Sequence, residues 1–572
     1  MHKKYAQLSA FTVLTLTSAM ALAVPFSSFD PRSMAMGGTG VAVDDPATAP
    51  FFNPAMLSES DHSKKFSVEF ATLGVSLVDL GNLHSNWSTM NNAVSALPNN
   101  VSTLSTNANT LSSNAPTLTS SIAALSTSIT SLASATPSTA AASLAAASTN
   151  LSAVTTNMST VSSNVTTVGN NANTVSTNIN QINKTLISLN NQPMQGELGA
   201  ASVIAIPGKN WGFAVYANAW AAVGGRLEYK DAGTVTTLTS ALTTTSTNLV
   251  GIGAATGNAA SALSTANTSL NTAVGLCTTA LVSTIPGAQA CSTALTNANT
   301  ALGNAQPSVN TASSTVTTNS ANITAAANSV NNTNKTTFQS VVHIRGVAVT
   351  EYGASISHGL VSNDVAWSWG ITPKVMQMRL YDATIGSSST LSNATSNDYL
   401  AYYSTLNFDA GIAKTYLNGW RTGLVVKNVI PQTFDFKNAL TPGATPVADG
   451  SKLNLSPQVR AGISYEQINW FNLALDADLT KNDPAGLENP SQYVAVGGEF
   501  STSGWAQIRA GYRADLVNSA LSQVSIGLGI SPRLPYYKPH LDLAITASPN
   551  IFNNGYNAAT QVGAYLQFGL NF

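Results

Sequence analysis

Apolar and polar residues alternate along much of this chain, and the alternation is clearest at its end. Residues 561–572 read QVGAYLQFGLNF, with apolar side chains at every second position from Val562 to Phe572. A period of two predicts a strand with one apolar and one polar face. A soluble β-sandwich can end on such a strand, but a closing strand that ends in an aromatic residue is typical of exported outer-membrane barrels. This segment alone leaves both architectures open.

The same alternation recurs about fourteen times, and the lengths of the connections favour a barrel. We expect strands at residues 65–80, 196–207, 211–229, 338–358, 364–382, 399–417, 420–436, 457–466, 470–480, 491–502, 505–517, 521–531, 539–548 and 560–572. Connections after even-numbered strands are short and those after odd-numbered strands are longer, as in outer-membrane barrels. The pattern predicts an all-β transmembrane barrel of about fourteen antiparallel strands, apolar outside and polar inside.

Two long segments, residues 86–191 and 232–334, have a period of seven instead. In the first segment, one row of apolar positions is Trp87, Val94, Val101, Ala108, Ala115, Ile122 and Ile129, and a second row lies three positions later. The rows resume in a new register after Thr136-Pro137-Ser138. Heptads on both sides of such a break predict an antiparallel α-helical coiled-coil hairpin with arms of about 70 Å. Disordered linkers or glycosylated stalks are the alternative.

The second segment repeats this design and contains both cysteines of the chain. Its rows are Leu242, Leu249, Leu263, Leu270 and Cys277, interrupted at Thr256, and Leu295, Leu302, Val309, Val316, Ile323 and Val330. Cys277 and Cys291 flank the turn LVSTIPGAQA, where two antiparallel arms converge. In an exported protein this placement predicts a disulfide, with free or metal-bound thiols as the alternative. A four-helix bundle of both segments stays open.

The first residues predict export. Lys3 and Lys4 precede a mostly apolar stretch, and Ala21-Leu22-Ala23 fits a signal-peptidase site, so we interpret residues 1–23 as a signal peptide rather than a buried helix. Residues 24–64 would then lead into a barrel formed by residues 65–85, 192–231 and 335–572. Because the heptad segments follow the first and third strands, we expect both on the extracellular side of a Gram-negative outer membrane.

The composition argues against several kinds of binding partner and catalytic site. Charged residues make up 9% of the chain, against about 25% in soluble domains, and the formal net charge is −1, so a nucleic-acid partner is not expected. The six histidines are scattered, which gives no metal or cofactor site. A carboxylate–arginine set in the predicted strands could be catalytic, but we expect a satisfied ladder inside the barrel and no enzyme. Its members are Asp476, Asp478, Glu499, Asp515, Asp542, Arg460, Arg509 and Arg513.

Residues 32–42, RSMAMGGTGVA, and residues 49–57, APFFNPAML, precede the first strand. Gly37, Gly38 and Gly40 permit positive φ, and a phosphate-binding loop is not expected because no strand precedes them and no Lys-Ser/Thr follows. The two stretches resemble the opening of the outer-membrane long-chain fatty-acid transporter (FadL) superfamily, closest to its plasmid conjugal-transfer TraF-type branch. The resemblance implies a FadL-like barrel with an N-terminal hatch that contains Asn53, Pro54 and Ala55. The two heptad segments depart from the family pattern.

The resemblance implies two functions between which the chain does not decide. The conjugal-transfer branch implies surface contact or assembly, with another cell surface or a transfer-apparatus component as partner. The transporter side implies transport or capture of a small hydrophobic molecule. A soluble periplasmic sandwich-type binding protein is a third class. For the barrel we expect outer-membrane lipid and the barrel-assembly machinery as partners, the latter recognising Tyr565, Phe568, Leu570 and Phe572.

Overall fold

The computed structural model describes residues 29–43, 45–58, 66–80, 83–136, 138–277, 285–332, 339–362, 365–386, 399–437, 439–440, 452–468, 470–482, 490–502, 505–532, 534, 536–554 and 560–572. The predicted signal peptide lies outside these residues. The chain divides into two units. One consists of Met1–Trp87, Leu186–Lys230 and Gln339–Phe572, and the other of Ser88–Thr185 and Asp231–Phe338.

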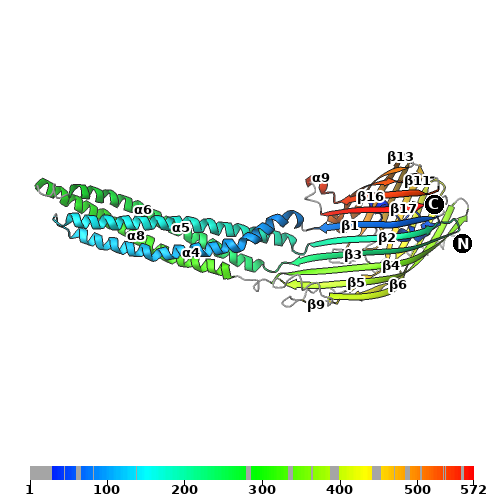
Figure 1. Ribbon diagram of the computed structural model, residues 1–572, viewed down its shortest axis with the longest axis horizontal. Coiled ribbons are helices and arrows are strands. Elements are labelled where there is room, and N and C mark those ends of the chain that lie inside the picture. The colour runs from blue at the N-terminus through cyan, green and yellow to red at the C-terminus, as the bar shows by residue number, and fades with distance from the viewer. Residues whose placement is uncertain are drawn as a thin grey trace, which may run out of the picture. The chain divides into compact units, whose positions relative to one another are not determined.

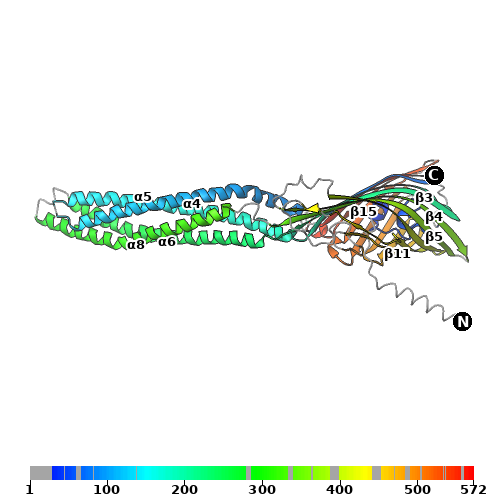
Figure 2. The same cartoon turned by 90° about the horizontal axis from the view of Figure 1, so that it is seen from below.

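The first unit is a closed antiparallel barrel of fourteen strands. The first strand lies beside the last, and the β4–β5 ladder completes the ring (Figure 1). Long strands gather on one side of the barrel, where β3, β4 and β5 are neighbours (Figure 2). The strands are β1 (Ser67–Asp79), β2 (Pro193–Ile206), β3 (Trp211–Glu228), β4 (Val341–Ser362), β5 (Val365–Gly386), β6 (Leu400–Tyr416), β7 (Trp420–Lys427), β11 (Gln458–Ile468), β12 (Phe471–Asp478), β13 (Tyr493–Thr502), β14 (Ala506–Asp515), β15 (Gln523–Ile530), β16 (Lys538–Ala547) and β17 (Gln561–Asn571).

The strand count is confirmed, but the expected strand at 420–436 is too long. β7 ends at Lys427 because Asn428 takes a positive φ of 53° and Pro431 lacks a backbone N–H. The chain then forms a separate hairpin of β8 (Gln432–Asp435) and β10 (Lys452–Leu455). Between them, β9 (Ala439–Leu440) pairs in parallel with β5.

The barrel turns its large aliphatic side chains outward. One row of register neighbours crosses five successive strands, each side chain 40–55% exposed: Ile508, Leu528, Leu543, Leu566 and Leu73. Aromatic rings gather at the rim with the short turns, where the ring centroids of Trp211 and His358 lie 4.3 Å apart and those of Trp470 and Phe500 lie 5.6 Å apart. An apolar outer band bordered by aromatic residues is the surface that a β-barrel presents to a bilayer.

Short helices complete this unit. Before β1 lie α2 (Pro31–Ala35), α3 (Ala49–Phe52) and the 3₁₀ helix η2 (Pro54–Leu57). At the opposite rim from the aromatic rings, the loops carry η6 (Ser519–Leu521) and α9 (Ile551–Asn554). None of the helices that the structure describes is both long and apolar enough to cross a membrane.

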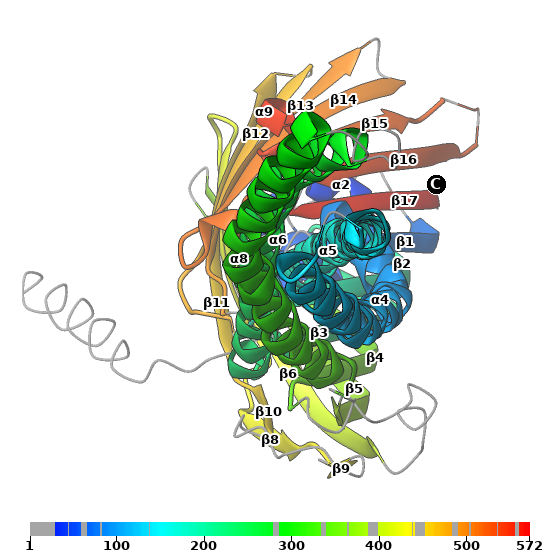
Figure 3. The ribbon, with the colours of Figure 1, turned by 90° about the vertical axis from the view of Figure 1, so that its left-hand side faces the viewer.

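The second unit is a four-helix bundle of α4 (Leu83–Ala133), α5 (Ala140–Leu189), α6 (Ala232–Leu276) and α8 (Ile285–Asn332), seen end-on in Figure 3. The two hairpins bond to each other as well as internally. Asn150 Nδ2 donates to the Ala124 carbonyl, 3.2 Å, across α4 and α5. Thr324 Oγ1 donates to the Ala108 carbonyl, 3.4 Å, across α8 and α4. The two hairpins therefore pack together as one four-helix bundle, a point that the heptad pattern alone left open.

The heptad positions form the core of this bundle. From Val101 onward, the predicted rows of α4 are buried except Ile129, and Leu144, Leu151 and Met158 are buried in α5. Thr256 does not interrupt the seam, because its buried hydroxyl donates to the Ile252 carbonyl at 2.9 Å. The prediction is wrong at Val94, which is 48% exposed, since Ala93 is the buried residue of that turn.

Candidate functional site

A hatch, residues 29–58, lies inside the barrel. Gly37 and Gly38 have φ values of 77° and 90°, which other residues rarely adopt, so two of the three predicted glycines are required by backbone conformation. At Gly40 there is no room for a side chain, because a Cβ there would lie 2.4 Å from the ring of Phe52 in the same hatch.

Glycines of the wall make room for this hatch. A Cβ added to any of ten inward glycines, one on each of ten strands, would come within 2.8 Å of a hatch atom. At Gly497 and Gly511, which pair with each other, the nearest atoms are backbone of Met36 and Gly37. The other eight are Gly74, Gly199, Gly212, Gly370, Gly411, Gly423, Gly462 and Gly527.

The Asn53-Pro54-Ala55 triplet fixes the second half of the hatch. The Asn53 side chain is fully buried; its Nδ2 donates to the carbonyls of Val41, 3.0 Å, and of Ile412 on β6, 3.1 Å. Its Oδ1 accepts from the Ala55 N–H, 3.2 Å, and so caps η2, whose first residue is Pro54. Asn53 therefore joins two parts of the hatch to the wall.

Arg32 provides the charged attachment of the first half. Its Nε and Nη2 each lie 3.0 Å from the Glu499 carboxylate of β13, and its Nη1 lies 3.2 Å from Asp45 in the hatch. Arg509 of β14 donates to the same Glu499, 2.6 Å, and also pairs with Asp542 of β16. Sequence reasoning missed Arg32, although it is the single cation in the quoted hatch motif.

Carboxylates of the wall also hold hatch backbone. Asp476 Oδ2 accepts from the N–H groups of Gly40, 2.8 Å, and Val41, 3.0 Å. Arg460 donates to Asp478, its register partner on the neighbouring strand, at 2.6 Å. The predicted ladder of buried, bonded charges is therefore present, and part of its role is to anchor the hatch.

Asp30 begins α2, where its Oδ2 accepts from the Ser33 N–H at 2.7 Å. Burial, and after it the charge of Asp45, raises the pKa of Asp30 to about 7. The carboxyl group of Asp30 in the hatch therefore changes its charge near neutral pH.

The lumen between the hatch and the long loops departs from the polar interior that we expected. One side of its wall is apolar, and the β8–β10 hairpin covers it with Phe434, Leu453 and Leu455. The Phe434 ring lies 5.1 Å from the ring of Tyr403, and the Tyr403 hydroxyl donates to the Asp435 carbonyl, 2.8 Å. The apolar wall consists of Trp220 and Ala222 on β3, Val347 and Val349 on β4, and Met376, Met378 and Leu380 on β5.

A cluster of buried charges lies below this wall. Lys374 Nζ is 3.0 Å from Asp409 and 3.7 Å from Glu351, and Lys427 Nζ donates to the Phe51 carbonyl of the hatch, 3.1 Å. Between the charges and the hairpin is a cavity of about 30 Å³, which can hold about two waters. Only with the hairpin displaced could these apolar walls above paired charges accept the tail and the polar end of an amphiphile.

Comparison with known proteins places this barrel in a family. The family described as "F plasmid transfer operon, TraF, protein" matches residues 50–478. The chain belongs to this family. The TraF-type prediction from the hatch motif and strand pattern is therefore confirmed.

Solved structures similar to this TraF-type chain include "TodX deltaS2S3 mutant monoaromatic hydrocarbon channel", with 9% identity, 95% of this chain and 97% of that chain covered, and a TM-score of 0.37. "CymD monoaromatic hydrocarbon channel" has 9% identity, coverage of 96% and 98%, and a TM-score of 0.37. The "Pseudomonas putida toluene transporter TodX" has 8% identity, coverage of 97% and 99%, and a TM-score of 0.36. No curated protein matches the sequence.

The closing strand of the TraF-type barrel has the predicted faces. Phe568, Leu570 and Phe572 lie on its outer side and Tyr565 on its inner side, where it is buried. The ring of Phe572 lies 5.8 Å from Phe66, immediately before β1, so the two ends of the barrel meet. That these residues act as an assembly signal stays a prediction.

The predicted disulfide is also present. Cys277 and Cys291 are bonded, with their Cα atoms 4.7 Å apart, and both side chains are buried. It connects α6 to α8 across residues 278–284, which lie outside the described part of the chain. Within that part, no three His, Cys, Asp or Glu side chains are grouped as metal ligands would be.

Proposed function

We propose that this TraF-type protein is a non-enzymatic outer-membrane anchor whose four-helix unit serves surface contact or assembly. The observation that carries the proposal is that both hairpins, which Leu186–Lys230 separates in the chain, form one bundle with a continuous buried seam. The chain enters both hairpins from the ends of β1 and β3, which lie on the same rim. A barrel that carries only a pore function has no need of such a unit.

The placement of the bundle outside the cell is part of the proposal. Phe572 and the aromatic rings lie at the short-turn rim, and the hairpins start from the other rim. Outer-membrane barrels have short periplasmic turns and long external loops. The hairpins then face the surroundings of the cell.

The surface of the bundle indicates the kind of contact. Apart from Lys184, residues 86–191 and 232–334 carry no charge. Many hydroxyls on the exposed faces bond to the carbonyl four residues earlier, as Thr110 does to Thr106 and Thr300 to Thr296. A neutral surface whose hydroxyls are already bonded has little electrostatic attraction for a partner. We therefore expect a contact that is insensitive to salt, with another cell surface or a transfer-apparatus component.

The test removes the bundle and leaves the barrel. Short linkers replace Ser88–Thr185 and Asp231–Phe338, and heat-modifiable gel mobility checks that the barrel folds in the outer membrane. We expect loss of cell–cell contact or of mating efficiency. A matched variant shortens all four arms by the same two heptads, which keeps the surface chemistry but reduces the reach. Unchanged contact after full deletion would refute the proposal.

A second function is favoured by the apolar lumen wall. Capture of a small hydrophobic molecule would use Trp220, Val349 and Met378, with the hairpin displaced from them. Binding of the uncharged probe N-phenyl-1-naphthylamine to detergent-purified protein tests it. We expect Leu455→Ala, which enlarges the cavity, to strengthen binding and Val349→Phe, which fills it, to weaken binding. Equal binding by both variants and the wild type would count against capture.

A further inference from the structure

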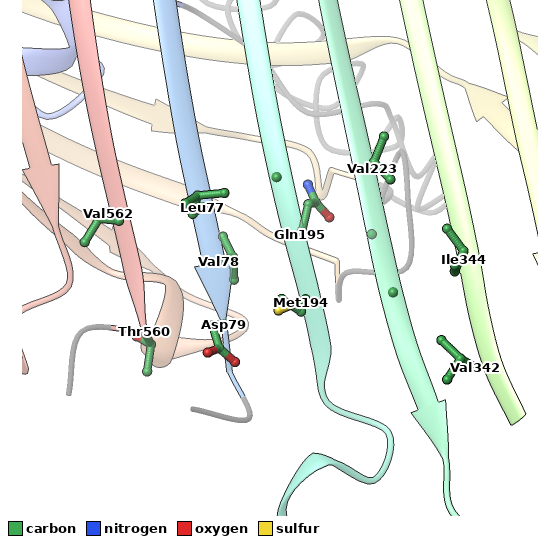
Figure 4. Close-up of a pocket in the computed structure, with 13 residues that line it drawn as sticks. Leu77, Val78, Asp79, Met194, Gln195, Val223, Val342, Ile344, Thr560 and Val562 are labelled. Atoms are coloured by element: carbon green, nitrogen blue, oxygen red, sulfur yellow. The ribbon is translucent and has the colours of Figure 1, made fainter. Parts of the chain in front are cut away.

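The outer wall of the barrel contains a groove in an otherwise ridged surface. It has a volume of about 490 Å³ and crosses β1, β2, β3 and β4 near the rim where β1 and β3 end (Figure 4). Leu77, Met194 and Val223, which line it, are outward side chains, 55%, 46% and 55% exposed. The groove therefore lies on the face that meets the bilayer and not in the lumen.

The strand register explains why the wall is hollow here. Leu77 pairs with Gly196, and Gly196 pairs with Val223, so one outward row reads large, glycine, large. In the next row Met194 pairs with Gly225, which pairs with Ile344. Glycines on adjacent strands thus leave two neighbouring positions without side chains. The row from Ile508 to Leu73, in contrast, is filled on five successive strands.

We infer that this groove binds one acyl chain of a membrane lipid. The groove continues the lipid-facing surface, so acyl chains are the molecules that meet it. Its walls are the aliphatic side chains of Leu77, Val223 and Ile344, and the floor over Gly196 and Gly225 is flat backbone. A linear apolar chain fits such a channel, and close contact with the walls adds dispersion attraction.

Apart from the buried Gln195, the polar residues that line the groove lie at one end of it. Asp79 and Thr560 line it where the strands reach the rim, and the remaining large side chains are apolar or lie deeper in the wall. An amphiphile with its polar end at the rim and its chain along β2 and β3 matches this distribution.

The glycines allow a test that does not strain the fold. A Cβ at Gly196 would meet only the flexible Cδ2 of Leu77, at 3.4 Å, and one at Gly225 would be 4.0 Å from the nearest atom, the His343 carbonyl oxygen. Gly196→Val with Gly225→Val therefore fills the groove with residues that strands favour. Gly498→Val, on the outer face of β13 with its nearest neighbour at 3.6 Å, is the matched control.

The full mature protein is placed in phosphatidylethanolamine–phosphatidylglycerol nanodiscs containing a phosphatidylcholine with a diazirine in its acyl chain. Photocrosslinked peptides are mapped by mass spectrometry. We expect crosslinks concentrated on the β1–β4 peptides in the wild type and the Gly498→Val control, and their loss in the double variant. Crosslinks spread evenly around the barrel, or unchanged by the double variant, would overturn the inference.

Discussion

Gly497 and Gly498 are adjacent on β13 but face opposite sides of the wall, which makes them a matched pair for testing the hatch. A Cβ at Gly497 would lie 2.2 Å from the Met36 carbonyl oxygen and 2.5 Å from its C and Cα, whereas the nearest atom to one at Gly498 is 3.6 Å away. Ordinary contact begins at 3.4 Å, so Gly497→Ala requires a shift of 3.4 − 2.2 = 1.2 Å. Backbone of the hatch must make this shift, since Met36 presents no flexible group there.

Such a shift separates the hatch from Ser525, which accepts from the Gly37 N–H, 3.1 Å, and donates to the Ala35 carbonyl, 2.9 Å. Overpacking by one methyl costs about 1–3 kcal/mol. Because 1.4 kcal/mol corresponds to a factor of about ten, we expect the amides of Met34 to Gly38 to exchange roughly five- to a hundredfold faster in Gly497→Ala.

Hydrogen exchange measured by mass spectrometry on the detergent-solubilised protein provides the assay, and conductance in planar bilayers shows whether the looser hatch opens the lumen. Heat-modifiable mobility checks that the barrel is intact in each variant. Gly498→Ala should behave as the wild type. If Gly497→Ala exchanges at the same rate as Gly498→Ala, the hatch is not wedged against β13 and the reasoning is wrong.

Three further predictions concern the hatch and the bundle. Arg32→Met removes a buried partner of Glu499 and Asp45 and should weaken hatch docking by about 3–5 kcal/mol, seen as faster exchange of α2, with Arg509 still paired to Glu499. Since the pKa of Asp30 is raised from 3.8 to about 7, protonation favours the docked hatch. Protection of the hatch amides from exchange should be highest at low pH and decrease as the pH rises toward 7. Asp30→Asn should flatten that profile while keeping the N-cap of α2. Replacing both cysteines by serine should lower the stability of the bundle tip by about 3 kcal/mol, measured by exchange in α6 and α8 near residues 277 and 291, with α4 unchanged. A pH profile that is the same in Asp30→Asn, or a tip unaffected by the serines, would contradict the respective argument.

Much of the architecture was readable from local periodicity. Alternation located fourteen strands, because the side chains of a half-exposed strand report its two environments residue by residue. The heptads located four helices, and the disulfide was predicted because both cysteines lie where two of the arms meet. The strand predicted at 420–436 was too long, because the alternation continues past Asn428 into β8 although the chain has left the barrel there.

What the sequence by itself determined, then, is the set of elements, their order and the faces of each strand, since these depend on residues a few positions apart. Only the tertiary structure decided which glycines receive the hatch, that Arg32 reaches Glu499, and that Gly196 and Gly225 are diagonal neighbours on the outer wall. These relations depend on register between strands and on how the hatch docks. Register and docking are set by the closure of the whole ring, which brings together residues hundreds of positions apart in the chain.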